Sequence, residues 1–303
     1  MLSLIMMKLF MVICVLANVA FVTLFERKIL GYIQYRKGPS KVGLMGLFQP
    51  IADAIKLFFK ELLLLGGSNK IMYMIMPLIS LMLMVMFWLT VALEYFSGVA
   101  QEYEVLTIMV ISSMGVYVIL GSGWASNSKY ALLGAYRGVA QTLSYEVALS
   151  FIIMILLMGP MTFILSKIFI YNQELVLSIL SGVFILMVWI MVLLAELNRT
   201  PFDMAEAESE LVSGFNVEYG GAMFAILFMA EYGNILFMSY ISTYLFFQGP
   251  GLMGWKVVVI MMIFLWLRGT LPRYRYDKMM MLVWKGLLPL LIMYMLIMVF
   301  GIM

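Results

Sequence analysis

The amino-acid sequence predicts an all-α integral membrane protein, a bundle of about eight transmembrane helices, and three observations support this fold class. Hydrophobic residues make up 65% of the chain, whereas soluble domains contain about 45–50%. The apolar residues form segments long enough to cross a bilayer core of about 30 Å, which takes roughly 20 helical residues. Basic residues gather in every second connection between these segments.

Eight segments have the required length, and charged residues or Gly and Pro separate them. The third and the seventh are the shortest, so composition defines their ends least well. The N-terminal segment has one lysine and no small-residue cleavage site, so we expect a retained membrane helix rather than a targeting peptide. Residues 1–303 are expected to form a single multi-spanning domain. The segments are residues 2–25, 71–93, 105–121, 138–160, 175–195, 219–247, 253–268 and 279–301.

The distribution of basic residues predicts the orientation of the bundle. Of the 19 lysines and arginines, 15 lie in the connections that follow odd-numbered segments. The positive-inside rule assigns these connections to one face, called the inner face below, and both termini to the outer face. Lys285 is an exception, because it lies within the eighth segment. The long polar inner connections are residues 26–70, 122–137, 196–218 and 268–278.

The first inner connection contains an amphipathic segment. Its apolar residues recur at helical spacing, while Asp53, Lys56 and Lys60 fall on the opposite face. Such a helix lies in the membrane interface rather than across it. A simple membrane anchor is an equally good interpretation of this pattern. The apolar residues are Leu47, Phe48, Ile51, Ile55, Phe58 and Phe59.

Composition excludes several kinds of redox centre. The chain has no histidine, and its only cysteine is Cys14, within an apolar segment. Haem ligation by imidazole, iron–sulfur clusters and zinc or copper sites need residues that are missing here. We therefore expect no haem, iron–sulfur cluster or metal on this chain. If the protein serves electron transfer, the electrons travel through other chains.

The stretch RTPFDMAEAESELVSGFNVEYG, residues 199–220, contains five acids and one base. Thr200 and Pro201 are typical of an N-cap and a first helical position, so the sequence predicts a helix that starts there. On that helix Asp203, Glu206 and Glu210 share one face, whereas Glu208 points elsewhere. Arg199 can neutralise only one of these acids. A solvated surface loop is the alternative interpretation.

Further acids lie in or beside the predicted membrane segments. Glu196 ends the fifth, Glu231 lies in the sixth and Glu146 in the fourth, while Glu218 closes the acidic stretch. Carboxyl groups at membrane depth are costly and by default mark ion or proton pathways. The residues alone thus predict a proton or cation pathway that is entered from the inner face. Arg137 either extends to the lipid headgroups or pairs with Glu146.

Five blocks of sequence, in order along the chain, resemble one family. They touch every long inner connection and the middle of the sixth segment, and together they are similar to chain 1 of NADH:ubiquinone oxidoreductase, the heel membrane subunit of respiratory complex I. The count of 32 methionines and the missing presequence fit the mitochondrially encoded type. The blocks are ERKILGYIQYRKGPSKVGLMGLFQPIADAIKLF, GWASNSKYALLGAYRGVAQTLSYEV, AELNRTPFDMAEAESELVSGFNVEY, FMAEY and RGTLPRYRYDKMM.

The resemblance implies a core membrane subunit that forms the floor and entrance of a ubiquinone tunnel, with ubiquinone as the substrate. It also implies an acidic path that couples quinone reduction to proton translocation. The tunnel residues would be Arg27, Gln34, Arg36, Asp53, Arg273 and Arg275. The proton path would comprise Glu146, Glu196, Asp203, Glu206, Glu208, Glu210, Glu218 and Glu231. Arg137 and Arg199 would be structural pairing partners.

The resemblance also implies partners and a location. The hydrophilic quinone-site and iron–sulfur subunits would dock on the inner, matrix face, and antiporter-like subunits would extend the membrane arm. The protein would be a multi-pass component of the mitochondrial inner membrane, surrounded by lipid, with no nucleic-acid partner.

Three other functions are weighed against this one. A stand-alone proton- or cation-coupled transporter could use Glu146 and Glu231, but it would be expected to show inverted repeats and broken helices, and the sequence shows neither. A structural anchor leaves the buried acids unexplained. The anchor of a membrane-bound hydrogenase is disfavoured by the five blocks and the methionine usage.

Overall fold

The computed structural model describes residues 2–61, 66–97, 102–165, 167–168, 179–205, 214–247 and 253–302. Throughout these ranges the regular structure is helical, and each of the eight predicted segments coincides with a helix. Seven helices are long and apolar enough to cross a membrane, and α7 has a shorter apolar part at Gly182–Glu196. The prediction of an all-α membrane bundle is confirmed. The long helices are α1 (Leu2–Ile33), α3 (Lys70–Ser97), α4 (Glu104–Ala125), α5 (Lys129–Leu157), α7 (Ile179–Glu196), α9 (Gly221–Phe246), α10 (Met253–Thr270) and α12 (Leu288–Ile302), the last preceded by α11 (Tyr276–Met281) and a π-helical turn, η3 (Leu282–Leu287).

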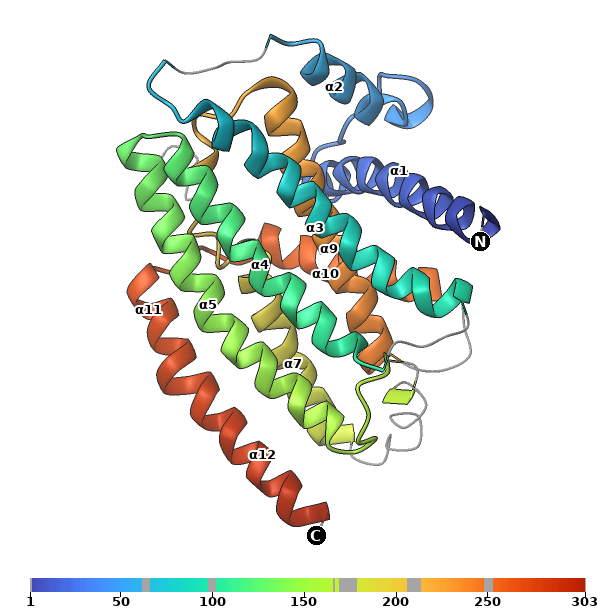
Figure 1. Ribbon diagram of the computed structural model, residues 1–303, viewed down its shortest axis with the longest axis vertical. Helices are drawn as coiled ribbons and strands as arrows, with labels where there is room; N and C mark the ends of the chain where they lie inside the picture. Colours follow the sequence, from blue (N-terminus) through green and yellow to red (C-terminus); the bar gives the residue numbers. More distant parts are fainter. Residues whose placement is uncertain are drawn as a thin grey trace.

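The helices pack around a common core (Figure 1). Helices α3, α4 and α5 lie side by side, α9 packs against α3, and α12 packs against the outer side of α5. The core contains the fully buried Trp189 of α7, whose indole N–H donates a hydrogen bond of 2.9 Å to the Ser242 hydroxyl of α9. Such bonds between small polar groups hold membrane helices together where hydrophobic burial offers little selectivity.

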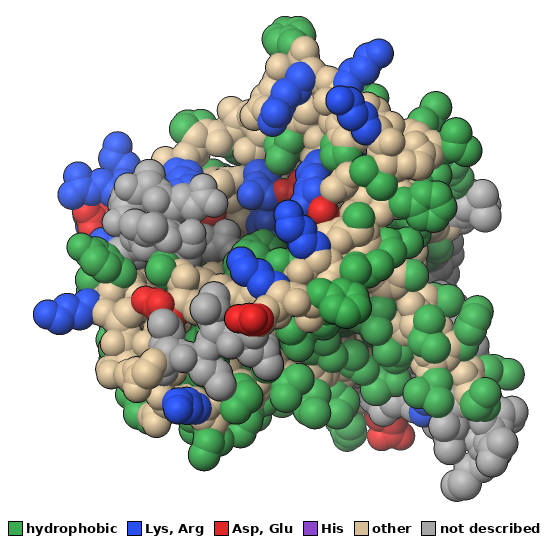
Figure 2. Space-filling view, turned by 90° about the horizontal axis from the view of Figure 1, so that it is seen from above, with side chains coloured by type: hydrophobic (Ala, Val, Ile, Leu, Met, Phe, Trp, Pro, Cys, Tyr) green, Lys and Arg blue, Asp and Glu red, His purple; other side chains and the backbone are tan. Residues whose placement is uncertain are grey.

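The inner connections meet at one end of the bundle. The Asn69 amide donates to the Ala125 carbonyl at 3.0 Å, which joins the connection before α3 to the α4–α5 connection. The Tyr274 amide donates to the Pro201 carbonyl at 3.0 Å, which joins the connections after α7 and α10. Seen from this end, lysine and arginine side chains surround a hollow in which acidic side chains are visible (Figure 2).

Two helix boundaries differ from the sequence prediction. Helix α1 continues to Ile33 instead of ending near residue 25, so Glu26 is a helical residue. The α4–α5 connection is only residues 126–128, because Ser128 caps α5 by accepting a hydrogen bond from the Ala131 amide at 3.4 Å. Helix α1 therefore ends later, and α5 starts earlier, than the apolar segments 2–25 and 138–160 predict.

The amphipathic segment forms the short helix α2 (Gln49–Phe58), which lies across the inner end (Figure 1). Pro50 is buried, whereas Ile51, Ile55 and Phe58 are about half exposed. An outward apolar face beside the membrane helices is the arrangement of an interfacial helix. A short 3₁₀-helix, η1 (Leu44–Gly46), precedes α2.

Candidate functional site

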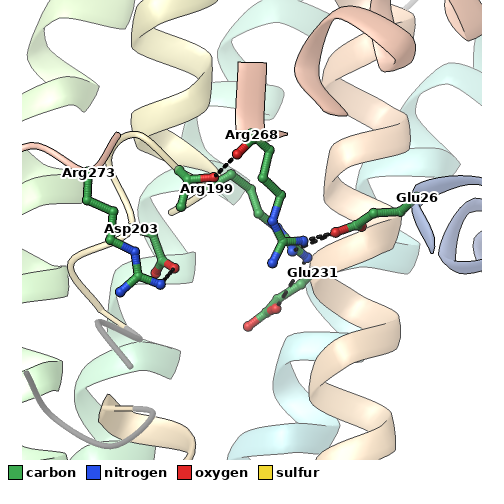
Figure 3. Close-up of polar contacts among 7 residues, drawn as sticks. Glu26, Arg199, Asp203, Glu231, Arg268 and Arg273 are labelled. Atoms are coloured by element: carbon green, nitrogen blue, oxygen red, sulfur yellow. Dashed lines mark hydrogen bonds and ion pairs between the residues drawn. The ribbon is translucent and has the colours of Figure 1, made fainter. Parts of the chain in front are cut away.

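Arg199 lies at the centre of the buried charges at the inner end (Figure 3). Its side chain is 11% exposed, and it stands between two carboxylates: 4.0 Å from Glu26 and 3.7 Å from Glu231. The guanidinium also lies over the ring of Tyr232, 4.6 Å from its centroid. Helices α1, α7 and α9 thus meet at a single cation.

Glu26 and Arg268 complete this group, and sequence reasoning missed both. Arg268, in the last turn of α10, forms an ion pair with the same Glu26 oxygen that faces Arg199. Glu26 is 4% exposed, and its second oxygen has no hydrogen-bond partner among the residues described. The available signal was an acid directly before the basic pair Arg27-Lys28. That signal does not identify the site, because the partners of Glu26, Arg199 and Arg268, are far away in sequence.

Asp203 and Arg273 form a second ion pair nearby, with 3.2 Å between Nη2 and Oδ2 (Figure 3). Asp203 is 4% exposed. The prediction of a helix starting at Pro201 is wrong for residues 201–205, which form turns. The Thr200 hydroxyl donates to the Arg268 carbonyl at 3.4 Å instead of capping a helix, since this segment is bound to the connection after α10.

A cavity of about 120 Å³ lies between α3, α4, α5 and α9, below the buried charges. This volume is enough for several water molecules. Glu196 and Glu231 are in its lining, and Oε2 of Glu196 and Oδ1 of Asn234 lack hydrogen-bond partners within the described part of the chain. Buried polar atoms without partners in a polar cavity are the usual sites of ordered water. Its other polar residues are Ser80, Ser112, Thr142 and Asn198.

Two further predicted residues, Glu146 and Arg137, lie on helix α5. Glu146, half-buried on α5, is within electrostatic reach of Glu196. Arg137 is half-buried on the same helix, nearer its start. Gln141, between them, is fully buried and donates through its side-chain N–H to the Ala195 carbonyl at 2.8 Å. Helix α5 therefore holds the end of α7, where Glu196 lies.

Glu218 lies at the far end of the acidic connection, where two tyrosines fix the backbone. The Tyr73 hydroxyl donates to the Glu218 carbonyl at 2.6 Å. The rings of Tyr73 and Tyr219 stack with centroids 4.3 Å apart. Burial raises the pKa of the Tyr219 phenol, and the neighbouring Tyr73 raises it further. The three acids Glu206, Glu208 and Glu210 lie outside the described residues.

The predicted tunnel residues fall into two groups. Arg27 and Asp53 form an ion pair of 2.6 Å, and Arg36 donates to Gln34 at 3.0 Å. Arg27 and Arg36 line an open hollow of about 600 Å³ between the end of α1 and α2, together with Lys37, Lys41 and Gln49. On the other side, Arg273 pairs with the buried Asp203, whereas Arg275 forms an exposed pair of 3.1 Å with Asp277.

The fold and this site define a multi-pass membrane protein in which acids and arginines are buried at the inner ends of the helices. A family model described as NADH dehydrogenase matches residues 6–299. The chain is 50% identical over 286 residues to NADH-ubiquinone oxidoreductase chain 1 of Heterololigo bleekeri, covering 91% of this chain and 90% of that protein. Identity is 49% over 289 residues to the same protein of Aedes aegypti, with 93% and 90% covered.

A vertebrate relative gives the same result. Chain 1 of Lampetra fluviatilis is 47% identical over 292 residues, which cover 93% of this chain and 90% of that protein. The chain therefore belongs to the NADH-ubiquinone oxidoreductase chain 1 family. It is a multi-pass membrane subunit of that respiratory enzyme, complex I.

Proposed function

We propose that this chain forms the floor and entrance of a ubiquinone tunnel and carries an acidic path that couples quinone reduction to proton translocation. Ubiquinone, named with the relatives above, is the substrate, and the other complex I subunits are the partners. The hydrophilic quinone-site and iron–sulfur subunits would cover the inner face, and the membrane-arm subunits would continue the path sideways. The location that follows is the mitochondrial inner membrane.

The observation that carries this proposal is the cavity lined by Glu196 and Glu231. It lies among membrane helices, it has room for water, and it contains unpaired polar atoms of Glu196 and Asn234 among the residues described. Carboxyl groups and water in such a place can pass protons, and their cost in a membrane is hard to explain otherwise. The cavity borders the buried pair Arg199–Glu231, so it adjoins the charges at the inner end.

The hollow lined by Arg27 and Arg36 supports the tunnel entrance. It opens where α1 ends and α2 lies in the interface, the level at which an amphipathic quinone headgroup leaves the lipid. Arg273 connects this end to the acidic connection through Asp203. A charge change near the tunnel floor would thus act on the buried acids, since Glu26 and Glu231 both face Arg199.

The test compares Glu231→Gln and Glu196→Gln in the assembled enzyme. The amide keeps size and hydrogen bonding but loses the titratable proton, so quinone-linked turnover and proton translocation should fall roughly tenfold or more. Electron transfer from NADH to an artificial hydrophilic acceptor should stay unchanged, because it does not use this chain. Wild-type rates of pumping in both variants would contradict the acidic path. Equal loss of both activities would indicate failed assembly, and Glu231→Asp, which keeps the carboxyl, then separates the two causes.

A further inference from the structure

Asn234 lines the cavity that contains the two acids, and the proposed function assigns it no role. It lies on α9 three residues after Glu231, so the two side chains share a face of the helix. Oδ1 of Asn234 is buried and has no hydrogen-bond partner among the residues described. A buried polar atom without a partner is costly, so the contents of the cavity have to supply one.

Asn234 lies at the same depth as two hydroxyl groups of the cavity. Asn234 on α9, Ser112 on α4 and Thr142 on α5 are each about 20 Å from the inner end of their helix. The inner ends are themselves close together, because Ala125 at the end of α4 packs in one cluster with Tyr219, just before α9. All three side chains line the cavity, so they form one polar level within it.

The hydroxyl protons at this level are already in use. Ser112 donates to the Met109 carbonyl at 2.8 Å, and Thr142 donates to the Gly138 carbonyl at 3.1 Å, each within its own helix. Towards the cavity these two oxygens can therefore only accept. Asn234 carries an amide, which can donate and accept at once. A water molecule at this level thus takes its orientation from Asn234.

Below this level the cavity is closed by apolar side chains. Phe87 and Met238 line it about one turn further from the inner end, and the ring of Phe87 packs on Phe237 with 4.6 Å between the centroids. Apolar groups offer water no hydrogen bond. The polar level around Asn234 is therefore the bottom of the wet part of the cavity, as far as the described residues form it.

Glu196 borders the same level from α7. Gln141, the residue before Thr142, donates to the Ala195 carbonyl at 2.8 Å, and Glu196 follows Ala195 at the end of α7. Oε2 of Glu196 is buried and, like Oδ1 of Asn234, has no partner within the described part of the chain. Two such atoms that border one polar cavity at one depth are where a bridging water is expected.

We propose that Asn234 is a positioning residue of the acidic path, whose side-chain amide holds the water that joins Glu231 to Glu196. Glu231 lies one turn away on the same helix face, and Glu196 borders the same space. The proton passes along the hydrogen bonds of the water, while Asn234 fixes this water and gives up no proton. The assignment of Asn234 rests on the proposed function, because it names the connection between two acids of that path.

The experiment compares Asn234→Leu and Asn234→Ser in the assembled enzyme. Leu has nearly the volume of Asn but no polar atom, so quinone-linked turnover should fall about fivefold, as for the loss of one hydrogen bond. The solvent deuterium isotope effect on turnover should rise, because proton transfer becomes rate-limiting. Ser keeps a hydrogen-bonding group and leaves room for a second water, so both quantities should stay near wild type.

The matched control is Ser239→Ala on the same helix. Ser239 is fully buried, donates to the Leu236 carbonyl at 2.7 Å and is not among the residues that line the cavity. Its replacement should change neither turnover nor the isotope effect. Electron transfer from NADH to an artificial hydrophilic acceptor, which does not use this chain, shows for each variant that the enzyme has assembled.

Wild-type turnover in Asn234→Leu would overturn the assignment of Asn234. So would a fall in turnover without a rise in the isotope effect, because that result indicates a structural role. The acidic path itself stands if Glu196→Gln and Glu231→Gln still lose turnover, and it fails if they do not.

A second measurement needs no variant, so it decides even if Asn234→Leu does not assemble. In a density map of the wild-type enzyme that resolves water molecules, a water should lie within hydrogen-bond distance of the Asn234 side chain, in the space that Glu196 borders. A map that shows no water there would refute the proposal.

Discussion

At the scale of single residues, Glu26 carries more charge contacts than its place in the sequence suggests. It faces Arg268 and Arg199 with one oxygen, in a position that is 4% exposed. Replacing Glu26 by Gln would leave two guanidinium groups with one counter-charge fewer. Because breaking a buried ion pair costs about 3–5 kcal/mol, we expect a loss of thermal stability of the assembled complex and of quinone-linked turnover.

The measurement for Glu26 has an exposed control. Asp277→Asn removes a carboxylate of a pair whose side chains are 79% and 61% exposed, where ion pairs contribute about 0–1 kcal/mol. It should therefore leave the midpoint of thermal inactivation nearly unchanged. Glu26→Asp should lie between the two. If Glu26→Gln and Asp277→Asn have equal effects, the buried network is not a source of stability.

The stacked tyrosines give a prediction in which two similar changes differ. Tyr73→Phe removes a hydrogen bond of 2.6 Å to the Glu218 carbonyl, so it should cost about 1 kcal/mol. Tyr219→Phe removes a buried hydroxyl that has no partner among the described residues, so it should cost little. Since burial raises the pKa of Tyr219, the phenol is neutral below its ordinary pKa and adds no pH dependence there. The midpoint of thermal inactivation of each variant tests this prediction. A larger decrease for Tyr219→Phe than for Tyr73→Phe would contradict it.

At the scale of elements, two glycines of α5 decide how closely the acidic connection approaches the helix. A Cβ atom at Gly134 would lie 2.9 Å from Gly214 Cα, and one at Gly138 would lie 3.0 Å from Ala205 Cβ. The two glycines are one turn apart and share a face. The ends of the connection that holds Asp203 therefore pack directly on the α5 backbone.

This packing predicts opposite signs for the same substitution. Gly134→Ala forces backbone atoms apart and should destabilise the complex by about 1–3 kcal/mol. Gly182→Ala, in α7, places a Cβ atom where nothing lies within 4 Å, so the gain in helix propensity of up to about 1 kcal/mol should remain. We expect the midpoint of thermal inactivation to be lower than wild type for Gly134→Ala, and equal to it or higher for Gly182→Ala. If Gly182→Ala lowered the midpoint of thermal inactivation and Gly134→Ala left it unchanged, the packing argument would be refuted.

The elements were largely predictable, and the contacts of the site were not. Apolar length and alternating basic connections are local properties, so they located all eight segments and the interfacial helix α2. The start of a helix at Pro201 failed because hydrogen bonds and an ion pair from residues 268–274 bind this segment. Glu26 was missed because its partners, Arg199 and Arg268, are far away in sequence. No local pattern contains that proximity.

At the scale of the whole molecule, the meeting of the inner connections at one end predicts their accessibility. With Cys14 replaced, single cysteines at the exposed positions Ser40 and Asp277 should react with a membrane-impermeant reagent from the same side of sealed membranes. A cysteine at the exposed Glu102, at the other end of α4, should react only from the opposite side. Labelling of Ser40 and Asp277 positions from opposite sides would disprove the eight-segment topology. If other subunits of the complete enzyme cover a position, its labelling is measured in membranes from which the hydrophilic arm has been removed.

The position of Arg199 has a thermodynamic consequence. Its distances to Glu26 and Glu231, 4.0 and 3.7 Å, are both longer than a direct charged hydrogen bond of about 2.7–2.9 Å, so one guanidinium is divided between two acids. Proton binding at one acid and arginine binding at the other are then linked equilibria, and linkage is reciprocal. A change in the Glu26–Arg199 interaction, including one caused by a charge arriving beside Arg268, would then change the free energy of proton binding at Glu231, and protonation of Glu231 would change the Glu26–Arg199 interaction by the same coupling free energy. The two acids, on α1 and α9, are thus coupled through the side chain of Arg199, which lies between them.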